Sequence, residues 1–263
     1  MFAKTSSYLN VLWQLLKSDF TVFRQFFIGK LINRLIWYGF ILAIFTYIFP
    51  MLGMIKGFGP FMAFSLLAGE GFWRMWSFSF EMVADLEGNR VIDYYLTLPL
   101  PSWLIFLKIT LFQTFQAIIF LIFLLPITKL IIWNITLASF SIPNFAIIFI
   151  ITNLFYGLFF IFLTSFCKNM QEVENIGFRV LFPMWFCGAS NFPWDIIQKS
   201  LSPYLSYIFL VNPLLYVMEG VHAAALGQGD YLNFWVCTGV LTLLTVIFGI
   251  LGIVQFKKRL DFV

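Results

Sequence analysis

Four long stretches of the chain contain no Asp, Glu, Lys or Arg: residues 35–55, 109–128, 130–167 and 231–256. A helix of about 20 apolar residues crosses the hydrocarbon core of a bilayer, so each stretch is long enough to span a membrane. The third stretch is too long for a single crossing. Polar residues cluster in its first half, so we expect its helix to begin near Pro143. The pattern predicts an α-helical membrane protein.

Two further segments are expected to cross the membrane although their pattern is weaker. Residues 59–82 are apolar at both ends but carry Glu70 and Arg74 near the middle, and residues 174–191 are short. The region 192–226 contains prolines, which remove backbone donors and restrict the preceding residue. We therefore expect that region to form a broken element, either re-entrant or on the outer surface.

The predicted fold class is an all-α integral membrane protein with six transmembrane helices and no separate domain. The six spans are expected at residues 28–50, 59–82, 104–128, 143–166, 174–191 and 232–256. Residues 5–27 place polar side chains at intervals of three and four opposite an aromatic and apolar face, which is typical of an amphipathic helix lying flat in the membrane interface. The alternative is that this helix simply extends the first span.

The distribution of Lys and Arg decides between six and seven spans, because cytoplasmic segments carry an excess of both. Six spans place twelve of these residues inside and three outside. The inside group is Lys4, Lys17, Arg24, Lys30, Arg34, Arg90, Lys108, Lys168, Arg179, Lys257, Lys258 and Arg259, and the outside group is Lys56, Lys129 and Lys199. A seventh span would move the cluster at 257–259 outside. We expect both termini in the cytoplasm.

Between the second and third spans, residues 84–98 form the most charge-dense segment of the chain. Its charged members are Asp85, Glu87, Arg90 and Asp93, and Pro99 follows. The length suits a short helix along the cytoplasmic surface that docks into another protein. A solvated loop is the alternative.

One face of the second span carries polar side chains at membrane depth. Glu70, Arg74, Ser77 and Glu81 are spaced by four, three and four residues, so they share one helix face. Ionisable groups in a membrane cost about 2.5–3.5 kcal/mol each on insertion scales and normally face protein or water. Two interpretations remain open: a translocation path, or a structural ion pair between Glu70 and Arg74. The other candidate path residues are Trp73, Gln113 and Gln116.

Composition narrows the possible functions. Hydrophobic residues make up 61% of the 263 residues and charged residues 11%, with a mean hydropathy of +0.93, so no sizeable soluble domain fits. The net charge of +4 is spread along the chain, and nucleic acid is not an expected partner. The sequence has no G-x-x-x-x-G-K-[ST] phosphate loop and no residue set suited to a metal site or to catalysis. We expect neither an enzyme nor a bound cofactor.

Several residue strings resemble the ABC-2 type permease family. Residues 85–90 read DLEGNR, residues 96–102 read LTLPLPS, and Lys108 follows; these are similar to the family's acidic stretch, L-x-x-P turn and basic start of the third span. Further on, FPMWFCG, NFP, VNPLLY and EG begin at residues 182, 191, 211 and 219, which resembles the family's pattern around a broken fifth span. His222 stands where the family usually has Arg, so a charge-pair role does not carry over to that position.

The resemblance implies a permease subunit of an ATP-driven exporter. The segment 84–98 would be the coupling helix, with Asp85, Glu87, Arg90 and Asp93 meeting the ATPase, and Pro193, Asn212, Pro213 and Glu219 would shape the outer element. Two copies of a separate ATPase subunit would bind ATP and Mg²⁺, and two permeases, expected to be a homodimer, would enclose the path. The expected location is the bacterial inner or plasma membrane, and the expected cargo is a lipid, a glycan or a drug-like amphiphile.

A secondary transporter driven by an ion gradient is the alternative function. It would use Glu70, Arg74 and Glu81 as its relay. Such folds are often built from internal repeats with paired broken helices, whereas this sequence has one clearly broken segment and no evident twofold repeat.

Overall fold

The computed structural model describes residues 2–53, 58–88, 94–95, 101–133, 135, 138–200, 203–229 and 231–260. For residues 2–7, 9, 102, 203, 259 and 260 it describes the backbone alone. The described residues form helices and short connections, with no strand among them. The predicted all-α fold is confirmed.

Long helices account for most of the structure. They are α1 (Phe2–Ala43), α3 (Phe58–Glu87), α5 (Ser102–Ile131), α6 (Ile142–Thr164) and α12 (Phe234–Leu260). A π-helical turn, η1 (Ile44–Ile48), and the short α2 (Phe49–Met51) continue α1. The shorter elements are α7 (Met170–Ile176), the π-helical η2 (Gly177–Leu181), α8 (Phe182–Phe186), α9 (Trp194–Ser200), α10 (Pro203–Phe209) and α11 (Pro213–Leu226).

Within the described residues, four helical stretches are long and apolar enough to cross a membrane. They are Asn10–Met51, Trp103–Ile131, Ile142–Thr164 and Phe234–Lys258. Helix α3 is also long, but Glu70, Arg74 and Glu81 interrupt its apolar sequence. The chain is therefore an α-helical protein with several segments suited to a membrane.

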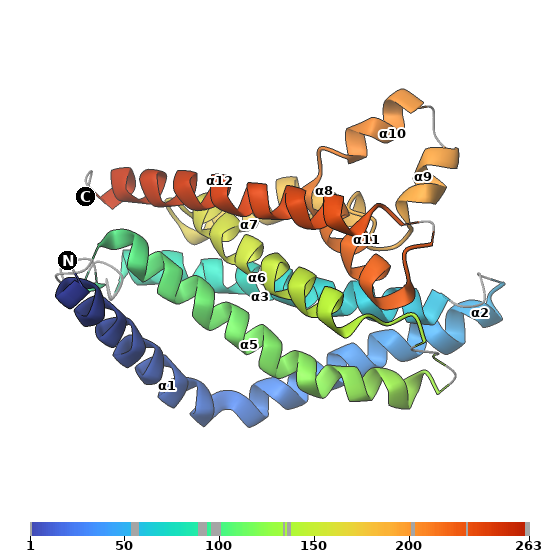
Figure 1. Cartoon of the computed structure of the whole chain (residues 1–263), viewed down its shortest axis with the longest axis horizontal. Helices are drawn as coiled ribbons and strands as arrows, with labels where there is room; N and C mark the ends of the chain where they lie inside the picture. The colour runs from blue at the N-terminus through green and yellow to red at the C-terminus, as the bar shows by residue number, and fades with distance from the viewer. Residues whose placement is uncertain are drawn as a thin grey trace.

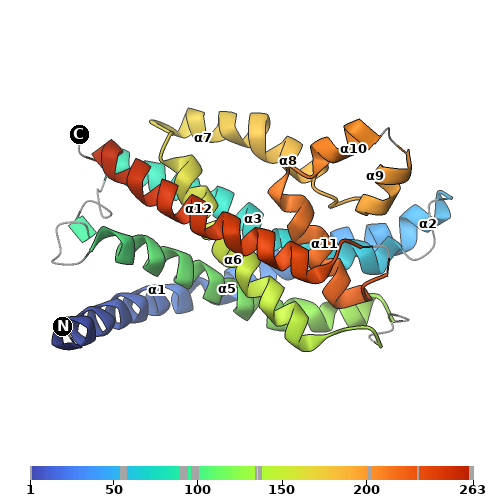
Figure 2. The same ribbon diagram turned by 45° about the horizontal axis from the view of Figure 1, so that its top comes forward.

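The long helices lie roughly along one axis of the molecule: α1 and α5 run in one direction, and α3, α6 and α12 run in the other (Figure 1). The start of α1, the end of α3, the start of α5 and the end of α12 lie at one end of the bundle, and α2, α9 and α11 lie toward the other (Figures 1 and 2). Helix α6 packs against α3, α5, α11 and α12. The chain thus runs repeatedly from one end of the bundle to the other.

Helix α1 joins two segments that the sequence pattern separates. It is continuous from Phe2 to Ala43, so the expected interfacial helix at 5–27 and the expected span at 28–50 share one helix, as in the alternative interpretation. The segment from Phe2 to Ala43 contains no proline. Nothing in the sequence therefore ends the helix at this point, although α1 changes direction along its length (Figure 1).

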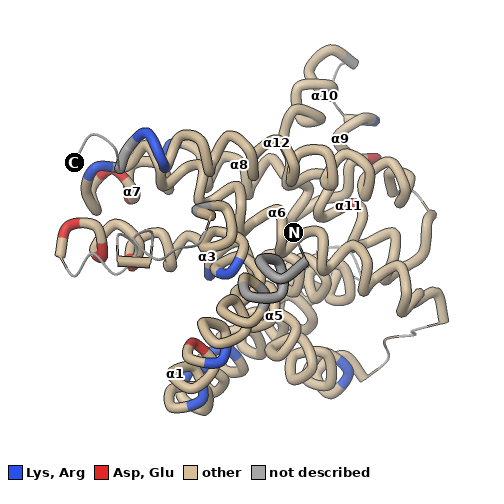
Figure 3. Tube along the Cα trace, turned by 60° about the vertical axis from the view of Figure 1, so that its left-hand side comes forward, with Lys and Arg blue, Asp and Glu red and all other residues tan. Residues whose placement is uncertain are grey.

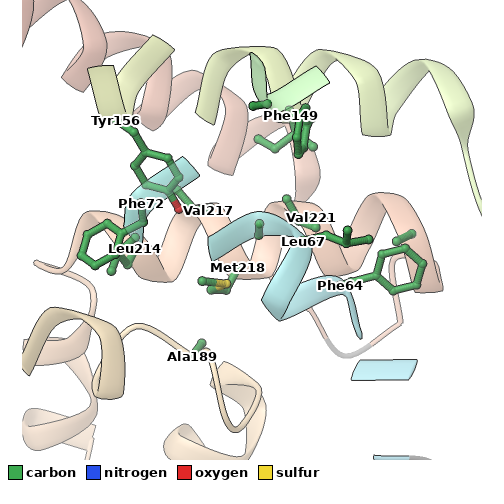
Figure 4. Close-up of a cluster of buried hydrophobic side chains, with 14 of the residues drawn as sticks. Phe64, Leu67, Phe72, Phe149, Tyr156, Ala189, Leu214, Val217, Met218 and Val221 are labelled. Atoms are coloured by element: carbon green, nitrogen blue, oxygen red, sulfur yellow. The ribbon is translucent and has the colours of Figure 1, made fainter. Parts of the chain in front are cut away.

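Aromatic and aliphatic side chains from α3, α6 and α11 fill the interior (Figure 4). Phe72 and Tyr156 pack edge to face, with their ring centroids 5.6 Å apart. Close approach of α3 and α6 depends on Gly71, where an added Cβ would lie 2.2 Å from Oδ1 of Asn153. Small residues at helix contacts are typical of membrane bundles, where packing drives helix association.

The region 192–226 forms three short helices, α9, α10 and α11. Pro213 is near the first position of α11, where its missing N–H would have no helical partner in any case. Helices α9 and α10 project beside the end of the bundle that lies away from the start of α1 (Figure 1). The region therefore does not form one continuous crossing.

Candidate functional site

An ion pair between α1 and α3 lies inside the bundle. The Arg34 guanidinium contacts the Glu70 carboxylate, and the two side chains are only 23% and 18% exposed. The Arg34 guanidinium also lies over the ring of Phe120 on α5, 4.3 Å from its centroid. A nearby carboxylate and an aromatic face both stabilise a cation that has lost its water. Three helices thus meet at one positive charge.

Arg74 lies one helical turn beyond Glu70 and faces a different helix. Its residue is 8% exposed, and its Nη1 donates a hydrogen bond to Oε1 of Gln113 on α5, at 3.1 Å. Of the two interpretations that the sequence leaves open for this face, the ion pair between Glu70 and Arg74 is therefore not the one formed. The carboxylate is taken by Arg34 from α1, and the Arg74 side chain extends toward α5 instead.

The remaining residues of the α3 face separate by burial. Ser77 and Glu81 are exposed, whereas Gln116 on α5 is buried. Trp73 is partly buried and packs against Trp185, with ring centroids 5.1 Å apart. The face that the sequence groups together is thus enclosed around Arg74 and opens to the surface one turn later.

A second ion pair links the base of α5 to α1. Nζ of Lys108 lies 2.6 Å from Oδ2 of Asp19, and the two side chains are 6% and 22% exposed. The same Nζ lies 4.8 Å from the ring centroid of Tyr95. Burial, together with the negative charges of Asp19 and Asp85, raises the pKa of Tyr95. The sequence pointed to Lys108 only as a basic residue at the start of a span and did not indicate its partner.

The charged segment between α3 and α5 is described only in part. Asp85 and Glu87 lie in the last turn of α3, and Glu87 is exposed. Arg90 and Asp93, the other two expected coupling residues, lie outside the described residues. The acidic half of the segment thus continues α3 without a break.

Glu219 ties together the region between α8 and α12. Its fully buried carboxylate accepts a hydrogen bond from the Trp194 N–H at 2.7 Å and another from the Leu232 N–H at 2.9 Å. One donor belongs to the start of α9, and the other to the connection before α12. Glu219 therefore acts here as a structural clamp between backbone segments distant in sequence.

Asn212 holds the start of α11 in place. Its Oδ1 accepts a hydrogen bond from the Leu214 N–H at 3.0 Å, as expected for an N-cap residue. Its Nδ2 donates to the Met184 carbonyl oxygen at 2.7 Å, which joins α11 to α8. The Pro193 carbonyl oxygen accepts from the Ile196 N–H at 3.2 Å at the start of α9. The four expected outer residues are thus assembled around the ends of the short helices.

His222 joins α11 to α3, a role that sequence reasoning did not identify. The fully buried ring stacks on Phe61 at a centroid distance of 4.1 Å. Its Nε2 lies 3.1 Å from the Phe61 carbonyl oxygen and 3.0 Å from Oγ of Ser65. Ser65 and the Phe61 backbone thus fix the position of the His222 ring between α11 and α3.

Charged side chains, not metal ligands, are the candidate ligand-binding groups in the described part of the chain. No group of three or more His, Cys, Asp or Glu residues that could hold a metal ion occurs among the described residues. The arginines around Glu70 are the groups best suited to bind a polar ligand inside the bundle. The chain matches no protein-family model, and no curated protein matches its sequence.

Proposed function

We propose that this chain is the membrane-spanning permease subunit of an ATP-driven exporter of the ABC-2 type. Two copies would enclose a path for a lipid, a glycan or a drug-like amphiphile, and a separate ATPase would supply the energy. The observation that carries the proposal is that the charged end of α3 lies at the same end of the bundle as the start of α1 and the end of α12, away from α9 and α11 (Figures 1 and 2). A docking face on one side and a broken element on the other suit such a subunit.

Six crossings are part of the proposal. The four apolar stretches supply four of them. Helix α3 would supply another, since its charged residues near the middle have partners on α1 and α5. The helical run from α7 through η2 to α8 would be the fifth crossing in chain order.

The charge distribution supports a cytoplasmic location for the end of the bundle that holds both chain ends. Lys257 and Lys258 are exposed near the end of α12, and Lys168 lies two residues before α7. Figure 3 shows basic positions near the C-terminal end of the chain and along α1. Cytoplasmic segments carry an excess of Lys and Arg, so this end would face the ATPase in a bacterial inner or plasma membrane.

The motor would be a different chain. The sequence of this chain has no phosphate-binding loop of the form G-x-x-x-x-G-K-[ST]. ATP and Mg²⁺ would be bound by two ATPase subunits. Their closure would act on the permease through the segment 84–98.

The test is purification of the tagged chain from its native membrane in mild detergent, followed by an ATPase assay with and without vanadate. We expect a separate nucleotide-binding subunit to copurify with vanadate-sensitive turnover. The double variant Glu87→Gln, Arg90→Gln should weaken that association, whereas Asp195→Asn, at a partly buried position of α9 at the other end, should not. Purification of a folded chain without ATPase would refute the proposal and favour a gradient-driven transporter.

A further inference from the structure

The positive charges around Glu70 outnumber the negative charges. Arg34 and Arg74 contribute two guanidinium groups: Arg34 contacts Glu70, and Arg74 lies one helical turn from Glu70 on α3. Glu70 contributes the one carboxylate that contacts either of them among the described residues. Gln113, the partner of Arg74, is neutral. The network therefore carries a net positive charge inside a bundle whose interior is mostly apolar.

Arg74 is also incompletely hydrogen-bonded. Its Nε is buried and has no hydrogen-bond partner within the described part of the chain, while the residue as a whole is 8% exposed. Leaving a buried charged donor unpaired is costly. A guanidinium group has a planar set of donors that matches the oxygens of a carboxylate or a phosphate. A carboxylate or phosphate oxygen would therefore supply the acceptor that Nε of Arg74 lacks among the described residues.

Glu70 already occupies part of such a site. Its carboxylate contacts Arg34 and lies one helical turn from Arg74. It retains partial exposure, and Ser77 further along the same face is exposed. An incoming anionic group could therefore replace the Glu70 carboxylate at Arg34 and also reach Arg74.

We propose that Arg34 and Arg74 form a binding site for the anionic headgroup of an amphiphile, with Glu70 as its built-in competitor. The partly buried ring of Trp73, one helical turn from Glu70 on α3, would contact the apolar part of the ligand. The inference deepens the proposed permease function, because it restricts the cargo to molecules with a phosphate or carboxylate group.

If Glu70 competes with the ligand, removing its charge should change the affinity for an anion in the opposite direction from removing either arginine. Replacing Arg74 or Arg34 removes an attractive charge, so Arg74→Gln and Arg34→Gln should each weaken anion binding. A lost hydrogen bond to a charged group corresponds to about 1.5–3 kcal/mol, or roughly 10- to 100-fold in affinity. Glu70→Gln removes the competing charge and should strengthen binding. A purely structural ion pair predicts no gain from Glu70→Gln.

The experiment is native mass spectrometry of the purified chain in detergent micelles, without any ATPase. The probes are dioctanoyl phosphatidylglycerol, dioctanoyl phosphatidylcholine and inorganic phosphate. We expect retention of the phosphatidylglycerol over the zwitterionic lipid, weaker retention in Arg74→Gln and stronger retention in Glu70→Gln. Lys30→Gln removes an exposed charge one turn before Arg34 and is the matched control, expected to bind like the parent protein.

Equal retention of the two lipids would overturn the proposal, and so would a Glu70→Gln variant that binds phosphatidylglycerol no better than the parent protein does. Displacement of the phosphatidylglycerol by millimolar phosphate would also overturn it, because the site would then bind a free anion. If Arg74→Gln does not give a folded protein on size exclusion, Arg34→Gln and Glu70→Gln still test the sign. Copurification of an ATPase without selective lipid binding would refute this site alone and leave the permease function standing.

Discussion

Breaking the ion pair between Asp19 and Lys108 should destabilise the protein strongly. Asp19→Asn would leave the Lys108 ammonium, whose side chain is 6% exposed, without its carboxylate partner at 2.6 Å. Removing one member of a buried pair typically costs about 3–5 kcal/mol. Water reaches Asp19, which is 22% exposed, and the Tyr95 ring remains beside the cation, so we expect a lower cost of about 2–4 kcal/mol.

The assay is unfolding by sodium dodecyl sulfate in mixed micelles, followed by far-ultraviolet circular dichroism. A double-mutant cycle with Asp19→Asn, Lys108→Met and both together isolates the pair, and residues in contact usually couple by about 0.5–3 kcal/mol. We expect the double variant to lose less stability than the two single losses combined. Lys17→Met removes an exposed lysine of α1 and should stay within about 0.5 kcal/mol of the parent. Additive losses in the cycle would refute the pairing.

Two further predictions concern packing and the outer helices. Gly71→Ala places a Cβ 2.2 Å from Oδ1 of Asn153 and should cost about 1–3 kcal/mol of stability in the same unfolding assay. In the control variant Gly29→Ala the added Cβ meets nothing within 4 Å, so this change should be neutral or slightly stabilising. Equal effects of the two substitutions would contradict the close contact at Gly71. Glu219→Ala leaves two backbone N–H donors unpaired, at about 1–3 kcal/mol each, so hydrogen exchange at those two amides should accelerate at least about fivefold, and unchanged exchange would rule out the clamp.

The long apolar helices were the most predictable part of the fold. Expected spans at 104–128, 143–166 and 232–256 lie close to α5, α6 and α12. A uniformly apolar helix is easy to recognise in a sequence because nearly every one of its residues is hydrophobic. The broken region was also predictable, since Asn212 and Pro213 have local effects on the backbone that need no knowledge of neighbouring helices.

Partners on other helices could not be predicted. Spacing of three and four shows that Glu70 and Arg74 share a face of one helix, but it does not show which helix packs there. Arg34 is thirty-six positions away from Glu70 in sequence, and only the packing of α1 on α3 brings them together. The same holds for Asp19 and Lys108. Periodicity also placed a boundary between two helices at residues 27 and 28, where α1 in fact continues. The side-chain pattern changes there, but the helical backbone hydrogen bonding does not.

Because α1 is one unbroken helix, its two ion pairs are mechanically joined. Asp19 at the charged end and Arg34 inside the bundle lie on the same helix, separated by about 22 Å at a rise of 1.5 Å per residue. A helix resists stretching, so a displacement of the base of α5 that pulls on Asp19 also shifts Arg34 relative to Glu70. Helix α1 would then transmit movement from the membrane surface to the interior of the bundle, where it would weaken or strengthen the ion pair between Arg34 and Glu70.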